Sequence, residues 1–481
     1  MRTINLRLAP ALAALVAALA LSGCASFSPD GGLSAVQASA RLDLGADVVK
    51  ISDDVQAENA QARARGLLKK GLTADRAVQV ALLSSKGLQA AFNDLGISEA
   101  QFVAASLPPN PSFSYLLVSG GGQLDIERKI IANLLSLLTL QTRKDIAQVK
   151  FQGAQLKAIN ATLKLAADTR RQFHRAVAAS EQVTYLAQAR SAAQTASELA
   201  KRLGETGAMG KLDQSREHAF YADLSAQIAK ARVLQGLEKE RLTRLMGLWG
   251  RDVAFALPAR LPALPGKLKG SATIEAEAIG RNASVKMARS DLDLVAKQFG
   301  LTKATRAINA LELSGALYSS RSRTVDPATG AVNIDKATKP GFELALEIPI
   351  FDWGEARTKE AEETYMRAAN LLAEKAVNVR SEVRESYVAY KGAWDVAQVY
   401  QNQVLPLRKT IQDEQQLQYN GMLADLFNLL QDARLRTLSN MAAIDARRDF
   451  WIADADLKAA IVGGGIGGGD AKPSTTVAGG E

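Results

Sequence analysis

The sequence is poor in the side chains that most often carry chemistry. Its 481 residues include one cysteine and two histidines, and only 5% of them are aromatic. A single thiol excludes intrachain disulfides and cysteine-based metal sites. His174 and His218 lie far apart in the sequence, and no histidine–carboxylate cluster has the spacing of metal ligands. We therefore predict that the protein is not an enzyme and binds no cofactor and no metal.

Long apolar runs are also missing. No stretch reaches the run of about 18 apolar residues that would indicate a transmembrane helix. The shorter run Leu8–Leu21 follows two arginines and is typical of a signal peptide. It ends in Leu-Ser-Gly-Cys, which is similar to a bacterial lipobox. We predict a lipoprotein signal peptide over residues 1–23 and covalent lipid, including palmitate, on Cys24. An ordinary signal peptide with an incidental cysteine is the alternative.

Charge of one sign is not concentrated in any block. The net charge of +9 is spread over mixed-sign segments such as Glu238–Arg241. Nucleic-acid binding would favour a basic patch with interleaved aromatic residues, and none is present. Solvated helix surfaces explain the charges better, so we predict no nucleic-acid partner.

Proline is absent from Thr142–Leu203, a stretch with one glycine and fifteen alanines. These residues favour a helix, and roughly 60 of them would form a rod about 90 Å long. Apolar residues recur at helical spacing in a narrow, alanine-rich stripe that permits close helix packing. Glycines after Leu203, among them Gly207, predict a left-handed turn into a return helix over Leu212–Leu248.

A different period precedes this rod. Leu107–Pro111 contains three prolines and stops a preceding helix. Phe113, Tyr115 and Leu117 then alternate with other residues, which predicts a strand. Leu124–Leu134 also alternates and predicts a second strand, although an amphipathic helix over Ile126–Leu138 fits the same residues.

The plan then repeats. Leu88 and Phe102 have counterparts in Val285 and Phe299, each 197 residues later. Strands are predicted around Leu311–Leu317 and Phe342–Ile350, with a polar loop over Arg321–Pro340 between them. A second long helix is expected from Ala356, interrupted near Pro406, followed by a last helix that reaches Ala460. The predicted organisation is a lipid-anchored arm at 24–71, a first repeat at 72–254, a proline-rich linker at 255–270, a second repeat at 271–461 and a disordered glycine-rich tail at 462–481.

This order resembles the outer membrane efflux protein family, the TolC-like outer membrane factors, and the lipobox resembles its lipid-anchored branch. Three patterns carry the resemblance: Leu72–Ala81 with the helix that ends at Leu107–Pro111, the lead-in Ile348–Gly354, and the two glycine turns. The resemblance implies a mainly α fold with a small β part. Duplicated helical hairpins would form a periplasmic tunnel, and four strands per protomer would enter a shared barrel in the outer membrane of a homotrimer.

The resemblance also implies partners and sites. A periplasmic adaptor protein would bind the hairpin tips at Gly207, Leu212, Gly421 and Leu426, and an inner-membrane pump would supply energy. Related proteins often carry an acidic ring in the second tip, but Phe427 and Leu430 stand there. The candidate gate residues are therefore Asp425, Phe427 and Asp432. Simple packing of Phe427, Leu429 and Leu430 between helices is the alternative.

Barrel strands alternate lipid-facing apolar residues with lumen-facing polar ones. This alternation assigns Leu344, Leu346 and Ile348 to lipid. The residues assigned to the barrel lumen are Glu343, Glu347 and Glu312.

The leading functional hypothesis is a passive exit duct of a tripartite efflux or secretion system. The alternative is a lipid-anchored periplasmic coiled-coil scaffold or adaptor without a pore. A scaffold has no need for strands with apolar and acidic residues on alternate faces, so Phe342–Ile350 favours the duct.

Overall fold

The structure is a computed structural model that describes residues 26–271, 273–308, 310–347, 349–421, 423 and 426–465, without the side chains of 426–428 and 430. The predicted signal peptide and Cys24 lie outside this range. Ile348, Asp425 and most of the predicted tail lie outside it as well.

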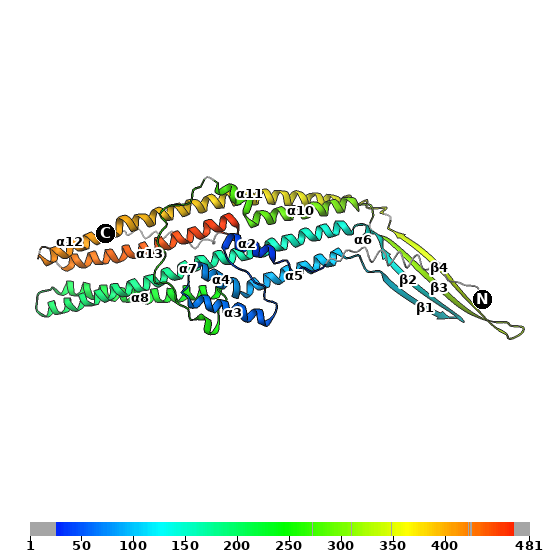
Figure 1. Ribbon diagram of the computed structural model, residues 1–481, viewed down its shortest axis with the longest axis horizontal. Helices are drawn as coiled ribbons and strands as arrows, with labels where there is room; N and C mark the ends of the chain where they lie inside the picture. The colour runs from blue at the N-terminus through cyan, green and yellow to red at the C-terminus, as the bar shows by residue number, and fades with distance from the viewer. Residues whose placement is uncertain are drawn as a thin grey trace. The chain divides into compact units, whose positions relative to one another are not determined.

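Helices dominate the described residues, and one sheet accompanies them (Figure 1), which confirms the predicted mainly α fold class. The elements of the first half are α2 Ser34–Leu44, α3 Asp54–Lys69, α4 Ala74–Ser84, α5 Lys86–Ser106, β1 Ser112–Gly120, β2 Gln123–Asn133, α6 Leu134–Leu138, α7 Leu140–Glu205, α8 Lys211–Leu245 and the 3-10 helix η1 Gly250–Val253. Those of the second half are α9 Ile274–Arg281, α10 Ala283–Ala304, β3 Leu311–Val325, β4 Val332–Leu346, α11 Glu355–Val399, the π-helix η2 Tyr400–Val404, α12 Leu405–Asn420 and α13 Leu426–Val462. The order of helices, strand pair and long hairpin therefore occurs twice.

The chain divides into two compact units that do not follow the repeats. Unit 1 comprises the described part of 1–32 with 94–155 and 287–373, and unit 2 comprises 33–93, 156–286 and the described part of 374–481. Each unit therefore combines segments of both repeats. The chain passes from one unit to the other within α5, α7, α10 and α11.

The four strands of unit 1 form one antiparallel sheet in the order β1-β2-β3-β4. Gly121 and Gly122 connect β1 to β2 with φ of 58° and 81°. Positive φ at both central residues is what a type I′ hairpin turn requires, and glycine adopts it without steric cost. Asp326 closes the second hairpin, because its side chain accepts a hydrogen bond of 2.8 Å from the backbone N–H of Ala328.

The segment after β1 combines the two alternatives that the sequence left open. It is a strand as far as Asn133 and a helix from Leu134. Asn133 marks the change, since its side chain accepts a hydrogen bond of 2.8 Å from the backbone N–H of Ser136 and caps α6.

The polar loop predicted over Arg321–Pro340 is wrong. β3 continues to Val325 and β4 begins at Val332, so the connection contains only residues 326–331. Backbone ladder bonds need no apolar side chain, and the register continues through pairs of polar residues such as Arg321 and Lys336.

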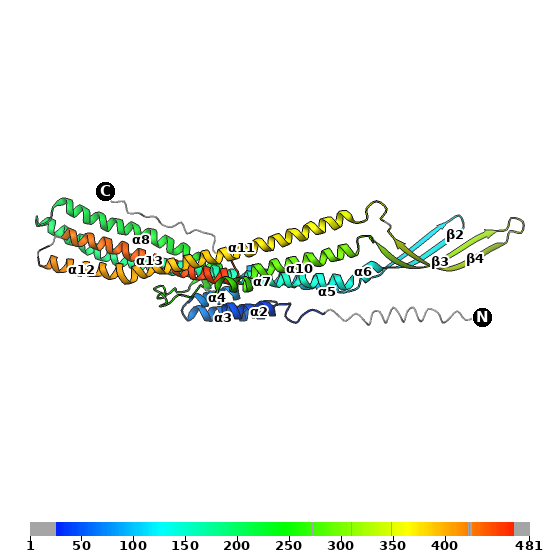
Figure 2. The ribbon, with the colours of Figure 1, turned by 90° about the horizontal axis from the view of Figure 1, so that it is seen from above.

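The main core of unit 2 surrounds the middle of α7. Phe173 and Val177 are buried there with Ala77 and Val80 of α4 and with Leu242 of α8. Small alanines let these helices approach closely, as the alanine-rich stripe predicted. α12 and α13 run side by side in both views (Figures 1 and 2).

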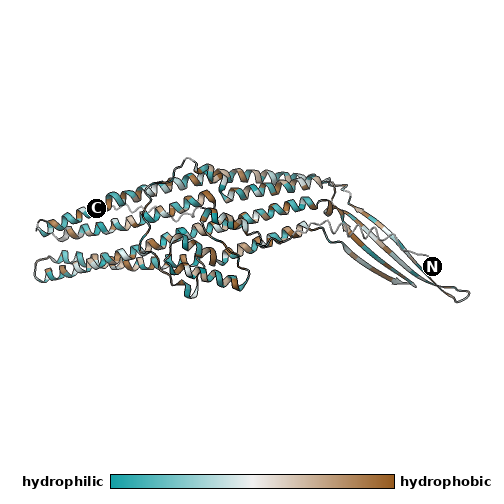
Figure 3. Ribbon diagram, viewed as in Figure 1, coloured by the Kyte–Doolittle hydropathy of each residue, from teal (hydrophilic) through white to brown (hydrophobic). Residues whose placement is uncertain are grey.

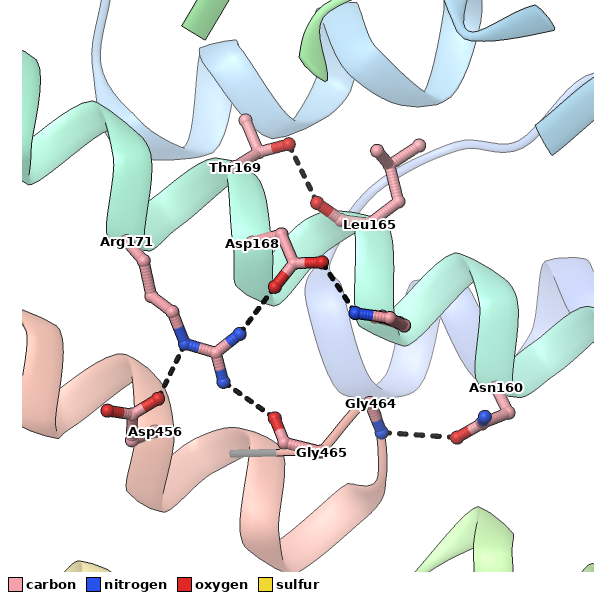
Figure 4. Close-up of polar contacts among 9 residues, drawn as sticks. Asn160, Leu165, Asp168, Thr169, Arg171, Asp456, Gly464 and Gly465 are labelled. Atoms are coloured by element: carbon pink, nitrogen blue, oxygen red, sulfur yellow. Dashed lines mark hydrogen bonds and ion pairs between the residues drawn. The ribbon is translucent and has the colours of Figure 1, made fainter. Parts of the chain in front are cut away.

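A buried ion pair and a glycine segment fasten the end of α13 to α7 (Figure 4). The guanidinium of Arg171 lies 2.5 Å from a carboxylate oxygen of Asp456 and 2.7 Å from one of Asp168, and it donates a hydrogen bond of 2.6 Å to the carbonyl of Gly465. The backbone N–H of Gly464 donates to Asn160 Oδ1 over 3.2 Å. The contacts of Gly464 and Gly465 place the first glycines of the predicted disordered tail against a helix.

The second rod is interrupted where the sequence predicted. Between α11 and α12 lies the π-helical turn η2, and Pro406 is in the first turn of α12. Proline lacks the N–H that continues a helical ladder, so the preceding carbonyls adopt another spacing.

No helix among the described residues combines the length and apolarity needed to cross a membrane. Figure 3 shows hydrophobic and hydrophilic residues interspersed along the helices.

Candidate functional site

The sheet has two chemically different faces. In an antiparallel pair, directly opposed residues lie on the same face. The register places Phe113, Ile130, Gly315 and Phe342 in one row across the four strands. We call this side the apolar face; its exposed large apolar residues are Phe113, Tyr115, Leu117, Ile130, Leu313, Leu317, Val325, Val332, Ile334, Phe342, Leu344 and Leu346.

The apolar face is uncovered in the single chain. The side chains of Phe342 and Phe113 are apolar, yet they are 87% and 67% exposed. A contiguous exposed apolar patch of this kind marks a surface that protein or lipid covers.

The opposite side, which we call the polar face, carries the carboxylates. Lys129 of β2 lies 2.5 Å from Glu343 of β4, and Ser314 of β3 donates to the same carboxylate over 3.4 Å. The ion pair of Lys129 and Glu343 therefore passes over β3, which lies between their two strands. The charged residues of the polar face are Asp125, Glu127, Lys129, Glu312, Asp335, Lys339 and Glu343.

The predicted lumen residues are placed as follows. Glu312 and Glu343 both lie on the polar face, whereas Leu344 and Leu346 lie on the apolar face. Glu347 comes after the last residue of β4, and its backbone N–H donates to the Ala310 carbonyl over 3.3 Å.

The sheet ends in two open edges. β1 and β4 each pair with one neighbour only among the described strands, so each presents a row of backbone donors and acceptors on its other side. Four strands are too few to close a barrel, and unpaired edges are unstable in lipid. The sheet therefore needs further strands from another chain if it is to enter a membrane.

The first hairpin tip has the left-handed glycine that the sequence predicted. Gly207 has a φ of 76°, and a Cβ added to it would meet no atom within 4 Å. The N–H groups of Ala208 and Met209 both donate to the carbonyl of Leu203, at 2.8 Å and 3.2 Å. These bonds satisfy the last turn of α7 before α8 begins. Leu212, one residue into α8, is 64% exposed.

The second tip differs from the first. Gly421 follows α12 with a φ of −81°, which is open to any residue, so the two glycine turns differ in backbone conformation. Leu423 is 83% exposed, and Leu426 begins α13.

The candidate gate residues are only partly described. Phe427 lies in the first turn of α13, and Asp432 is half-buried further along that helix. Asp425 precedes the helix and lies outside the described residues.

A contact between α8 and α13 was missed by sequence reasoning. The guanidinium of Arg434 lies 4.5 Å from the ring centre of Phe220 and donates to the carbonyl of Arg216 over 2.9 Å. Glu217 is buried beside them; burial raises the pKa of its carboxyl, and the charge of Arg434 opposes that rise. Nothing in the sequence distinguishes Arg434 from the other helix charges.

A cavity of about 650 Å³ lies among the helix ends of unit 1. Its lining includes Phe102 and Arg143 from the first repeat, and Phe299, the counterpart of Phe102, with Arg357 from the second. Phe102 stacks on Phe151 at 5.9 Å between ring centres, and Phe299 stacks on Tyr365 at 6.4 Å. The equivalence read from the sequence is therefore visible as paired aromatic contacts.

Solved structures with the same arrangement are outer membrane proteins. The VceC outer membrane protein of Vibrio cholerae is 16% identical, with 85% of this chain and 98% of that chain covered and a TM-score of 0.64. The Campylobacter jejuni CmeC outer membrane channel is 17% identical, with 83% and 86% covered and a TM-score of 0.62. The Neisseria gonorrhoeae MtrE outer membrane channel, in its open state, is 16% identical, with 84% and 89% covered and a TM-score of 0.64. The chain has the TolC-like fold.

No protein-family model and no curated protein sequence matches the chain. The TolC-like fold is nevertheless retained at about one identical residue in six. Helix period, strand alternation and turn glycines specify it, and many different residues satisfy those patterns.

The histidines of this TolC-like fold occupy structural positions. His174 is buried against Phe173 and stacks on Trp451 at 5.5 Å. Burial lowers the pKa of its imidazole to about 4, so the ring is neutral at pH 7. His218 contacts Ser197 through Nδ1 over 2.5 Å. In the part of the chain that is described, no group of three or more histidine, cysteine or carboxylate side chains is placed to hold a metal ion.

Proposed function

We propose that the protein is the outer-membrane channel component of a tripartite efflux or secretion system, a passive duct across the periplasm and the outer membrane. The observation that carries the proposal is the sheet: one face is apolar and exposed, the other carries carboxylates, and both edges are open. The TolC-like fold supports it, because VceC, CmeC and MtrE are outer membrane proteins or channels by name.

The open edges support a trimer. Three copies would pair β4 of one protomer with β1 of the next and close a twelve-stranded barrel without a free edge. The apolar face would then contact lipid and the polar face would line water. Lipid on Cys24 would add an anchor in the same membrane.

The exposed hairpin tips support partners at the periplasmic end. Leu212 and Leu423 expose apolar side chains at the turns of the two hairpins, where a periplasmic adaptor protein would bind. Transport energy would come from an inner-membrane pump.

The scaffold without a pore is the second candidate, and the sheet disfavours it. A scaffold in water would bury or replace Phe113 and Phe342, whereas a lipid-facing barrel needs both.

The test is single-channel conductance of the purified protein in a planar bilayer, with its mass determined in detergent. We expect a trimer that conducts in discrete steps. A monomer or dimer would favour the scaffold.

A sealed tip would make a trimer silent, so the gate variant Asp425→Ala/Phe427→Ala belongs to the same experiment. We expect this variant to conduct more than the wild type, because it removes a charged and a bulky side chain from the constriction. Unchanged conductance would contradict the gate assignment. A trimer that stays silent in both forms would contradict the duct.

A further inference from the structure

The sheet separates its acidic and basic residues by face. All five carboxylates of the strands lie on the polar face. Four of the six basic residues lie on the apolar face, namely Arg128, Arg321, Arg323 and Lys336. An apolar face with cations and no acidic residue is chemically suited to an amphipathic anion.

Three of these cations form one group, which we call the cationic cluster: Arg321, Arg323 and Lys336. Arg321 is directly opposite Lys336 in the register, so their Cβ atoms are about 5 Å apart. Arg323 is two residues further along β3 on the same face, about 7 Å from Arg321. All three side chains are exposed, and none forms an ion pair with a residue that the structure describes.

The cluster lies one bilayer thickness from the helical end of the sheet. Ten residues of β3 separate Leu311, where the strand begins, from Arg321. That is about 34 Å along the strand, or about 26 Å along the membrane normal at a tilt of about 40°, against an apolar band of about 25 Å in barrels of this kind. The exposed apolar residues Leu313 and Leu317 lie between the two ends.

The topology assigns the cluster to a leaflet. Helices join the sheet at Ser112, Asn133, Leu311 and Leu346, and both hairpin turns lie at the opposite end, next to the cluster. If the helices occupy the periplasm, as the proposed function requires, the cluster faces the outer leaflet. This step of the inference rests on the proposed function.

A second copy of the chain does not supply the missing anion. The apolar face has no carboxylate on any strand, so a neighbouring sheet brings none to that side. Asp326, in the hairpin loop, accepts a hydrogen bond of 2.8 Å from the backbone N–H of Ala328 and forms no ion pair with the cluster in the described part of the chain.

We propose that the cationic cluster binds the phosphate groups of a phosphorylated glycolipid in the outer leaflet, with the acyl chains lying on the apolar face. Guanidinium groups donate two parallel hydrogen bonds to one phosphate, and lysine adds a point charge. Arg128, opposite Tyr115 and Leu317, carries a fourth charge within the apolar band, where a long side chain extends its charged end toward the headgroups. The continuous apolar surface favours a lipid over free phosphate.

The test is native mass spectrometry of the detergent-solubilised trimer mixed with diphosphoryl lipid A. The comparison ligands are a lipid with the same acyl chains and no phosphate, and inorganic phosphate. We expect the wild type to retain the phosphorylated lipid at least about tenfold better than its dephosphorylated counterpart, and Arg321→Gln/Lys336→Gln to lose most of that preference. Equal retention of the two lipids, or displacement by inorganic phosphate at an equal concentration, would overturn the proposal.

Lys339→Gln is the matched control. It removes the same charge from the same strand three residues from Lys336, but on the polar face. We expect it to bind like the wild type, and an equal loss in Lys339→Gln would overturn the site. Should the double variant fail to assemble, Lys336→Gln and Lys336→Arg provide the comparison: the first loses the preference and the second keeps it.

The two levels of failure are distinguishable. A wild-type trimer that conducts but does not prefer the phosphorylated lipid contradicts only this inference. A chain that neither trimerises nor conducts contradicts the proposed function, and the assignment to the outer leaflet falls with it.

Discussion

The sheet of unit 1 and the helices of unit 2 accommodate charge in different ways. In the sheet, position alone decides: carboxylates occupy one face, and the opposite face has none. In the helices, Arg171 enters the interior together with two carboxylate partners, Asp168 and Asp456. The two faces of the sheet therefore differ in the sign of charge that they carry, whereas in the helical interior a buried charge is costly unless a partner compensates it.

Removing Arg171 should have the largest effect. Arg171→Ala leaves two carboxylates and the Gly465 carbonyl without their buried donor, which costs about 3–5 kcal/mol of unfolding free energy. Denaturant unfolding of the detergent-solubilised protein measures this. The control Lys164→Ala removes an exposed pair with Asp168 and should cost about 0.5 kcal/mol or less. Equal losses in both variants would show that the helical interior does not need the partner.

A charge placed on either face of β4 tests whether the apolar face contacts lipid and the polar face contacts water. Leu344→Arg puts a guanidinium on the apolar face and should destabilise the membrane-inserted form by about 2–4 kcal/mol. Ala345→Arg, one residue away on the polar face, should change it little. The resistance of the trimer to heat in lipid compares the two, and equal effects would contradict the assignment of faces.

Protonation of His174 introduces a charge into the helical interior without a substitution. Its pKa is about 4 in the folded protein and about 6.5 in the unfolded chain, so the unfolded chain binds the proton first as the pH falls. Stability from this residue is complete above pH 6.5 and declines toward pH 4, by about 3 kcal/mol at pH 4.

His174→Phe keeps a ring beside Trp451 and cannot titrate. We expect its unfolding free energy to fall less than that of the wild type between pH 7 and pH 4.5. Parallel pH curves for the two proteins would assign the acid sensitivity to carboxylates instead.

The smallest change in unfolding free energy is expected at the hairpin tips. There the backbone conformation, and not charge, limits which residue is tolerated. Gly207→Ala forces a side chain into the left-handed region and should cost about 1–2 kcal/mol. Gly421→Ala meets no such strain and should be neutral or stabilising by up to about 1 kcal/mol. Thermal unfolding of the two variants checks the difference, and identical shifts would contradict the different turn geometries.

Regular patterns made much of this fold predictable. Phe342, Leu344 and Leu346 alternate cleanly and lie in β4, and the proline-free alanine-rich stretch is α7. The strand segments from Arg321 to Val325 and from Val332 to Pro340 were missed, because a sequence rule that equates polar residues with loops fails where most residues of a hairpin are polar.

Contacts between distant residues had no local signal. Lys129 and Glu343 are separated by 214 residues, and only the pairing of β2 and β4 with β3 brings them together. Asp125, Glu127 and Lys129 could have been found, since they alternate along β2 as Glu343 does in β4. The contact of Arg434 with Phe220 depends on how two helices pack, which no spacing within either helix reveals.

The attachment of Gly465 to Arg171 also constrains when this core can form. The two residues are 294 positions apart, so a ribosome that adds about 5–20 residues per second makes the acceptor about 15–60 seconds after the donor. During nearly all of that interval the guanidinium of Arg171 has neither Asp456 nor the Gly465 carbonyl. The middle of α7 therefore completes its packing only after nearly all of the described chain has been synthesised, and a chain held unfolded until then gives up only the local pair of Arg171 with Asp168 at this site.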